Sequence, residues 1–156
     1  MKFTGYLDFY NELTEAIFRT YNLNEHGPER YHVKHRAFLL FKLTVFLDEA
    51  RGNDYLSQLF TLKRTALSYL AKKHHLTIDE VKNFDIDRVL ISLFFELQSY
   101  NLPGDIRNAI ANSYPVGAEA LQDVFNTNHM LGPFRSAEWI PDRFDELKSE
   151  GKRQLY

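Results

Sequence analysis

The 156-residue sequence predicts an all-α fold, a single-domain bundle of about six to eight helices around two apolar central helices. Apolar residues recur at three- and four-residue steps through most of the chain, which is the period of an amphipathic helix. Glycine and proline interrupt this pattern, and no segment alternates apolar and polar residues as a strand does. The length suits one domain with a substantial core, so we assign residues 1–156 to a single helical domain.

The first two helices are predicted by an apolar stripe and by a break in the chain. The stripe of the first helix consists of Phe3, Leu7, Tyr10, Leu13, Ile17 and Tyr21. Gly27 and Pro28 then interrupt the pattern, and a second helix, residues 29–51, follows and stops before Gly52. Residues 37–47 are apolar on almost every side, so we expect this second helix to be central.

Residues 85–101 form the second predicted central helix. Both central helices carry polar residues along one narrow line, which we expect to face solvent. In residues 29–51 this line consists of His35, Lys42 and Glu49. In residues 85–101 it consists of Ser92, Glu96 and Ser99. An ion pair between Glu96 and Lys42 would join the two helices.

The remaining predicted helices are shorter, and several begin at recognisable capping residues. Asn53 or Asp54 can cap a helix at residues 55–75. Thr77 and Glu80 have the spacing of a capping box, so a short helix starts there. Further helices are predicted at residues 104–114 after Pro103, at 115–125, and at 141–150 before Gly151.

Residues 129–156 form a C-terminal segment in which large apolar side chains are concentrated but periodicity is weak. These side chains are Met130, Leu131, Phe134, Trp139, Ile140 and Phe144. One interpretation is a strap that closes the core, and the other is an exposed aromatic patch of the kind that anchors a protein interface. The candidate partner-binding residues of this segment are Phe134, Trp139, Asp142, Asp145 and Glu146.

Composition excludes several classes of protein. Cysteine is absent, so the chain has no disulfide, thiol chemistry or thiolate zinc site. Acidic residues interrupt the apolar pattern of the N-terminus, which argues against a signal peptide, and the longest apolar stretch is too short to span a bilayer. We therefore expect a soluble, cytoplasmic protein that needs no cofactor.

The net charge of −2 conceals an uneven distribution along the chain. Residues 1–76 hold 11 Lys or Arg against 8 Asp or Glu, whereas residues 77–150 hold 6 against 13. The first segment therefore carries a formal charge of +3 and the second −7. An acidic half of this kind suits a basic partner and disfavours nucleic acid.

The stretch "RYHVKHR", residues 30–36, gathers cationic and titratable side chains at the start of the second helix. Arg30 and His35 are separated by four residues, which resembles the Arg-x4-6-His signature of the HEPN family of helical ribonucleases. The resemblance covers these two positions, and it implies metal-independent cleavage of RNA in which both side chains act. Tyr31 stands where that family usually carries a polar Asn or Asp.

Two other groups of residues have the spacing of a binding site. His32 and His35 lie three residues apart with Glu29 one turn earlier, which is compatible with a metal, but the ordinary alternative is a pair of partly exposed histidines, and we predict no metal site. The predicted helix at residues 55–75 is basic. Its cationic and titratable residues are Lys63, Arg64, Lys72, Lys73, His74 and His75. They form no single stripe, so nucleic-acid binding is not the preferred interpretation.

The sequence thus favours a small protein-binding module without catalysis. Its most specific form is an immunity or antitoxin-type neutraliser of a basic toxin or nuclease, which acts through complementary charge. The alternative is a HEPN-like ribonuclease that uses Arg30 and His35. The identity of the partner and the oligomeric state are left open.

Overall fold

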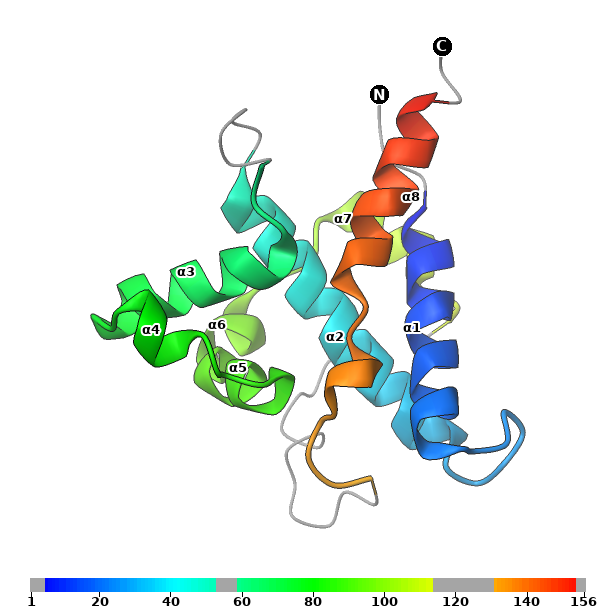
Figure 1. Cartoon of the computed structure of the whole chain (residues 1–156). Coiled ribbons are helices and arrows are strands. Elements are labelled where there is room, and N and C mark those ends of the chain that lie inside the picture. Colours follow the sequence, from blue (N-terminus) through cyan, green and yellow to red (C-terminus); the bar gives the residue numbers. More distant parts are fainter. Residues whose placement is uncertain (1–4, 53–58, 114–130, 154–156) are drawn as a thin grey trace.

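The computed structural model describes residues 5–52, 59–113 and 131–153, and within these ranges the chain is helical with no strand (Figure 1). In chain order the helices are α1 (Tyr6–Tyr21), α2 (Arg30–Arg51), α3 (Leu62–His74), α4 (Ile78–Val81), α5 (Ile86–Ser92), α6 (Phe94–Ser99), α7 (Gly104–Ile110), the 3₁₀ helix η3 (Ser136–Glu138) and α8 (Pro141–Arg153). The all-α fold class is confirmed. The helix predicted at residues 115–125 and the cap at Asn53 or Asp54 lie outside the described ranges.

Helix α2 is the centre of the molecule. Figure 1 shows it running between α3–α6 on one side and α1 with α8 on the other, and it packs against α1, α3 and α6. Its residues from Val33 to Val45 are buried with the exception of Lys34, because neighbouring elements cover every side of the helix. This confirms the prediction that the second helix is central.

Local sequence explains where several helices begin and end. Asn22 adopts a left-handed conformation at the end of α1 (φ 52°), a position that asparagine tolerates better than most residues. The side chains of Thr61 and Asp85 accept hydrogen bonds from the first turns of α3 and α5. Thr77 and Glu80 form the predicted capping box of α4, so that prediction is confirmed.

The second predicted central helix differs from expectation. The single helix predicted at residues 85–101 is divided into α5 and α6 at Leu93, whose backbone (φ −103°, ψ 10°) leaves the helical region. One face of this segment is buried, whereas Ile91 and Phe95 on the other face are exposed. The segment lies at the edge of the bundle, so its neighbours cover only one of its faces and some of its apolar side chains stay exposed.

The predicted solvent-facing line on α2 is wrong for two of its three residues. His35 and Lys42 are buried, and Glu49 alone is exposed. Both lie in the part of α2, from Val33 to Val45, that is buried on nearly every side. A polar residue in a helix that is surrounded on all sides has to be satisfied inside the protein, because solvent cannot reach it.

Two helix boundaries also differ from the prediction. Helix α3 begins at Leu62 rather than at residue 55, since Thr61 provides the cap. Helix α8 continues through Gly151 to Arg153. Within the described ranges, no helix combines the length and apolar character that a membrane crossing requires.

The described part of the C-terminal segment closes the core. Trp139 donates a hydrogen bond from its indole Nε1 to the Thr44 hydroxyl of α2 (3.1 Å), and both side chains are buried. Phe144 of α8 packs edge-on against Phe9 of α1, with the ring centroids 5.2 Å apart. Residues 131–153 therefore join α1 to α2 across the bundle, as expected of a strap.

Candidate functional site

The five predicted partner-binding residues fall into three groups. Phe134 and Trp139 are each 6% exposed and belong to the core, so they do not form the exposed aromatic patch that the sequence allowed. Asp145 is half-buried and its carboxylate faces α2, whereas Asp142 and Glu146 are exposed on α8. The surface candidates are therefore the two exposed carboxylates.

A buried ion pair lies beneath the strap. Arg36 of α2 and Glu138 of η3 have side chains that are 0% exposed, and they form a bidentate pair. Arg36 donates from Nε to Glu138 Oε1 (2.7 Å) and from a terminal nitrogen to Oε2 (2.8 Å). Two buried charges are stable together only when their remaining hydrogen bonds are also made.

Neighbouring groups make those remaining hydrogen bonds. The Arg36 guanidinium also donates to the Gly132 carbonyl (2.7 Å) and to the Tyr21 hydroxyl (2.7 Å), and the Phe134 ring lies 3.9 Å from its carbon Cζ. The Tyr21 hydroxyl donates to Glu138 (2.6 Å). Burial and this hydrogen bond raise the pKa of the Tyr21 phenol. The cluster connects α1, α2 and the strap, which is a structural role.

The sequence interpretation did not single out Arg36 or Glu138. They are 102 residues apart, so no local spacing relates them. The one available signal was an arginine at the start of the apolar run of α2, one residue before Ala37. That signal indicates a buried cation but does not identify its partner.

A second charged network joins the end of α2 to α8. Arg51 donates to both oxygens of Asp145 (2.8 and 3.1 Å) and to Asp48 (2.6 Å). Lys148 donates to Asp48 in turn (3.0 Å). Asp145 is thus committed to holding α8 against α2, which makes it a structural residue in the described molecule.

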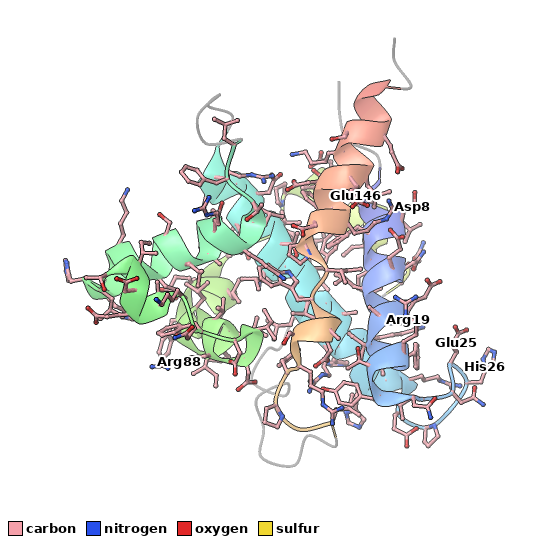
Figure 2. The ribbon with its side chains drawn as sticks, viewed as in Figure 1. Asp8, Arg19, Glu25, His26, Arg88 and Glu146 are labelled. Atoms are coloured by element: carbon pink, nitrogen blue, oxygen red, sulfur yellow. The ribbon has the colours of Figure 1, made fainter. Side chains whose placement is uncertain are left out.

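Acidic side chains gather on the outer face of α1 and α8. We define the α1–α8 carboxylate face as Asp8, Glu12 and Glu15 of α1 with Asp142, Glu146 and Glu150 of α8. Each set of three repeats at three- or four-residue steps, which places its members on one side of its helix. Figure 2 shows Asp8 and Glu146 at the same end of the two neighbouring helices.

Arg143 lies at the centre of this face and connects its two helices. It donates from Nε to Glu12 of α1 (2.9 Å) and from a terminal nitrogen to Glu146 (3.1 Å) and Glu150 (3.3 Å) of α8. These hydrogen bonds to carboxylates raise the pKa of Arg143, so it stays charged. Six carboxylates and the Arg143 guanidinium sum to a formal charge of −5, and Arg19, exposed one turn after Glu15 on α1, adds a positive charge at one end of the face.

The two residues of the ribonuclease hypothesis differ in exposure. Arg30 is exposed at the first turn of α2, while His35 is 4% exposed, with the Tyr31 ring 4.3 Å from its own. A histidine that exchanges protons with RNA has to reach the sugar and phosphate. In the described structure this imidazole is covered.

The residues of the metal and nucleic-acid interpretations lie apart. His32 is half-buried and His35 is buried on successive turns of α2, and no three His, Asp or Glu side chains of the described ranges are grouped as metal ligands. On α3 the cationic residues are exposed, and Lys73 is engaged in an ion pair with Glu96. Glu96 therefore pairs with α3, where the sequence had suggested Lys42.

No protein-family model, curated protein or solved structure matches this chain. The function is accordingly inferred from the site geometry alone. Of the charged arrangements described above, the cationic residues of α3 and the α1–α8 carboxylate face are exposed, and the carboxylate face is the one of these two that extends over two helices.

Proposed function

We propose that this protein is a binding module for a basic protein partner, without enzymatic activity of its own, and that the partner binds the α1–α8 carboxylate face. The observation that supports the proposal is the contact of Arg143 with three carboxylates from two adjacent helices, on which three further acidic side chains are exposed. Charge of one sign on a partner surface accelerates encounter with the opposite sign and excludes wrongly charged partners.

The arrangement also reduces the cost of binding. Arg143 connects Glu12, Glu146 and Glu150, which limits the rotamers of three carboxylates before a partner arrives. Rigid helices carry all six acidic groups. Side chains that are already ordered lose less entropy when an interface forms.

In its most specific form, the proposal makes the partner a basic toxin or nuclease that this protein neutralises. A nuclease presents Lys and Arg to the phosphates of its substrate. A rigid carboxylate face competes for that same surface, so binding and inhibition would coincide. The acidic balance of residues 77–150 is consistent with this form of the proposal.

Affinity capture with charge-reversed variants tests the proposal. The tagged protein is used to capture partners from a lysate of its own source, and the intact mass of any stoichiometric partner is measured. The face variant is Asp142→Lys with Glu146→Lys, and the matched control is Glu25→Lys with Asp79→Lys. Both control carboxylates are exposed, and Figure 2 shows Glu25 in the loop that follows α1.

The wild type and the control are expected to capture one basic protein at one-to-one stoichiometry, with affinity that falls as salt rises. The face variant should bind it at least about tenfold more weakly, a loss of about 1.4 kcal/mol. Equal capture by all three proteins, or no stoichiometric partner, would overturn the proposal. Cleavage of total RNA by the purified protein, lost in Arg30→Ala, would favour the ribonuclease instead.

A further inference from the structure

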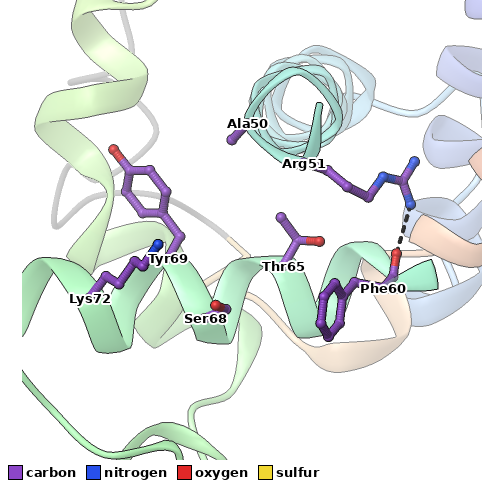
Figure 3. Close-up of a pocket in the computed structure, with 7 residues that line it drawn as sticks. All are labelled: Ala50, Arg51, Phe60, Thr65, Ser68, Tyr69 and Lys72. Atoms are coloured by element: carbon purple, nitrogen blue, oxygen red, sulfur yellow. Dashed lines mark hydrogen bonds between the residues drawn. The ribbon is translucent and has the colours of Figure 1, made fainter. Parts of the chain in front are cut away.

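A cavity of about 270 Å³ lies between the end of α2 and one face of α3 (Figure 3). Helix α3 contributes Thr65, Ser68, Tyr69 and Lys72, which share a face because they are three, four and seven residues apart. The volume is just below the range of roughly 300–1,000 Å³ that is typical of ligand pockets. The cavity therefore suits a small molecule, and none of its lining residues belongs to the α1–α8 carboxylate face.

The polar lining of the cavity favours an anion. Among the residues that the structure describes, it consists of the cations Arg51 and Lys72 and of hydroxyl groups on α3, without a carboxylate. The Arg51 side chain is 7% exposed, and its Nε has no hydrogen-bond partner within the described ranges although the terminal nitrogens are engaged. Because this nitrogen is shielded from solvent, a ligand in the cavity does not reach it, and the donors available to an anion are those of Lys72 and the hydroxyl groups.

Lys72 provides the unbalanced charge. Arg51 and Lys148 are offset by Asp48 and Asp145, which makes that network of four side chains formally neutral. Lys72 is exposed at the end of α3 and forms no ion pair with another described residue. Among the described lining residues Lys72 thus leaves one net positive charge, which suits a ligand with a single acidic group.

The rest of the lining is apolar. The Phe60 ring, which is 50% exposed, lies at one end of the cavity, and the Ala50 methyl group lies on the α2 side. The Tyr69 ring is fixed by an edge-on contact with Phe46, with centroids 5.5 Å apart. Flat rings of this kind pack well against an aromatic ligand.

We propose that this cavity binds a small aromatic acid, with its acidic group at Lys72 and Ser68 and its ring beside Tyr69. A carboxylate and a phosphate monoester share the required chemistry. The site lies apart from the proposed partner surface, so its existence does not depend on the proposed function.

Nuclear magnetic resonance titration of the ¹⁵N-labelled protein tests this site. The probes are benzoate and phenyl phosphate as aromatic anions, benzyl alcohol as a neutral ring, and inorganic phosphate as an anion without a ring. At least one aromatic anion is expected to give saturable shifts in the amides of Ala50, Thr65 and Tyr69. Benzyl alcohol and inorganic phosphate should bind at least tenfold more weakly, and benzoate against phenyl phosphate distinguishes the two acids.

Substitutions on α3 complete the experiment. Lys72→Met and Ser68→Ala replace exposed side chains. Each is expected to weaken binding of the aromatic anion, and Lys72→Met should lower the affinity tenfold or more. The control is Lys63→Met, because residue 63 lies half a turn around the helix from residue 72. Absence of saturable shifts, equal binding of either control probe, or unchanged affinity in Lys72→Met would each overturn the proposal.

Discussion

Arg36 and Glu138 show how a single residue can depend on another that is distant in sequence. Both side chains are shielded from solvent, and each carries a charge that the other offsets. Such a pair contributes little net stability compared with an apolar pair of the same shape. Removing one partner destabilises the protein, because the remaining charge is then buried without a counter-charge.

We expect Arg36→Met to destabilise the protein by about 3–5 kcal/mol, since it strands the Glu138 carboxylate. The double variant Arg36→Met with Glu138→Gln should be more stable than Arg36→Met alone, because glutamine is neutral and still accepts a hydrogen bond from Tyr21. Urea unfolding monitored by circular dichroism gives the free energies of unfolding.

The control for this pair is Arg30→Ala, which removes an exposed arginine from the same helix. Its free energy of unfolding should stay within about 0.5 kcal/mol of the wild type. A loss in Arg36→Met as small as that of the control would contradict a buried, mutually dependent pair.

The Glu96 side chain makes a contribution to the free energy of unfolding that depends on pH. Burial opposes ionisation of this side chain, but the hydrogen bond and charge of Lys73 outweigh it, and the pKa of Glu96 is lowered. The ordinary pKa of glutamate, about 4.3, applies to the unfolded chain. The unfolded state then binds the proton more readily, so this contribution is present above about pH 4.3 and is lost as pH falls through the folded-state pKa.

The wild type should therefore be more stable than Glu96→Gln near pH 6, and the difference should shrink towards pH 3. Urea unfolding of both proteins across this pH range measures the difference in their free energies of unfolding. Asp79→Asn is a suitable reference because the Asp79 side chain is 89% exposed, and its stability difference should be small. A difference between wild type and Glu96→Gln that does not shrink in acid would show that Lys73 does not stabilise the ionised form.

Helices α5 and α6 contain apolar residues whose burial depends on neighbouring helices and cannot be predicted from their own sequence. Leu97 is fully buried, whereas Phe95, two residues earlier, is 75% exposed. Both residues are equally apolar in the sequence, and only the position of the segment at the edge of the bundle separates them.

Leu97→Ala is expected to destabilise the protein by about 2–5 kcal/mol, through lost burial and the cavity that remains. Phe95→Ala should change the free energy of unfolding by about 0.5 kcal/mol or less, because its ring already faces solvent. Thermal unfolding followed by circular dichroism compares the two variants directly. Comparable losses in both would mean that the Phe95 ring is covered in solution.

The sequence predicted the elements better than it predicted their surroundings. The period of the apolar residues and the capping pair Thr77 and Glu80 are local signals, and the helices they indicate are present. Burial of His35 and the pairing of Glu96 with Lys73 depend on which helices are neighbours, which no local pattern specifies. The carboxylate face was predicted in part for the same reason, since Asp142 and Glu146 were named but Glu150 and the three residues of α1 were not.

At the scale of the whole molecule, the strap and the bundle are connected at several places. Glu138 binds Arg36 of α2, Asp145 binds Arg51 at the far end of the same helix, and Arg143 binds Glu12 of α1. Trp139 adds a buried hydrogen bond to Thr44, which lies between Arg36 and Arg51 on α2. Detaching residues 131–153 would expose Phe134, Trp139, Phe144 and the core side chains beneath them to water, so the strap has no stable detached state with an intact core.

The strap and the bundle are therefore expected to unfold in one transition. Trp139 is the single tryptophan of the chain, and it lies in the strap, so its fluorescence reports the strap alone. Far-ultraviolet circular dichroism reports the helices of the whole bundle. In urea the two signals should give the same midpoint and slope, as a two-state transition requires. A red shift of the fluorescence at lower urea than the loss of helix would instead show that the strap detaches first.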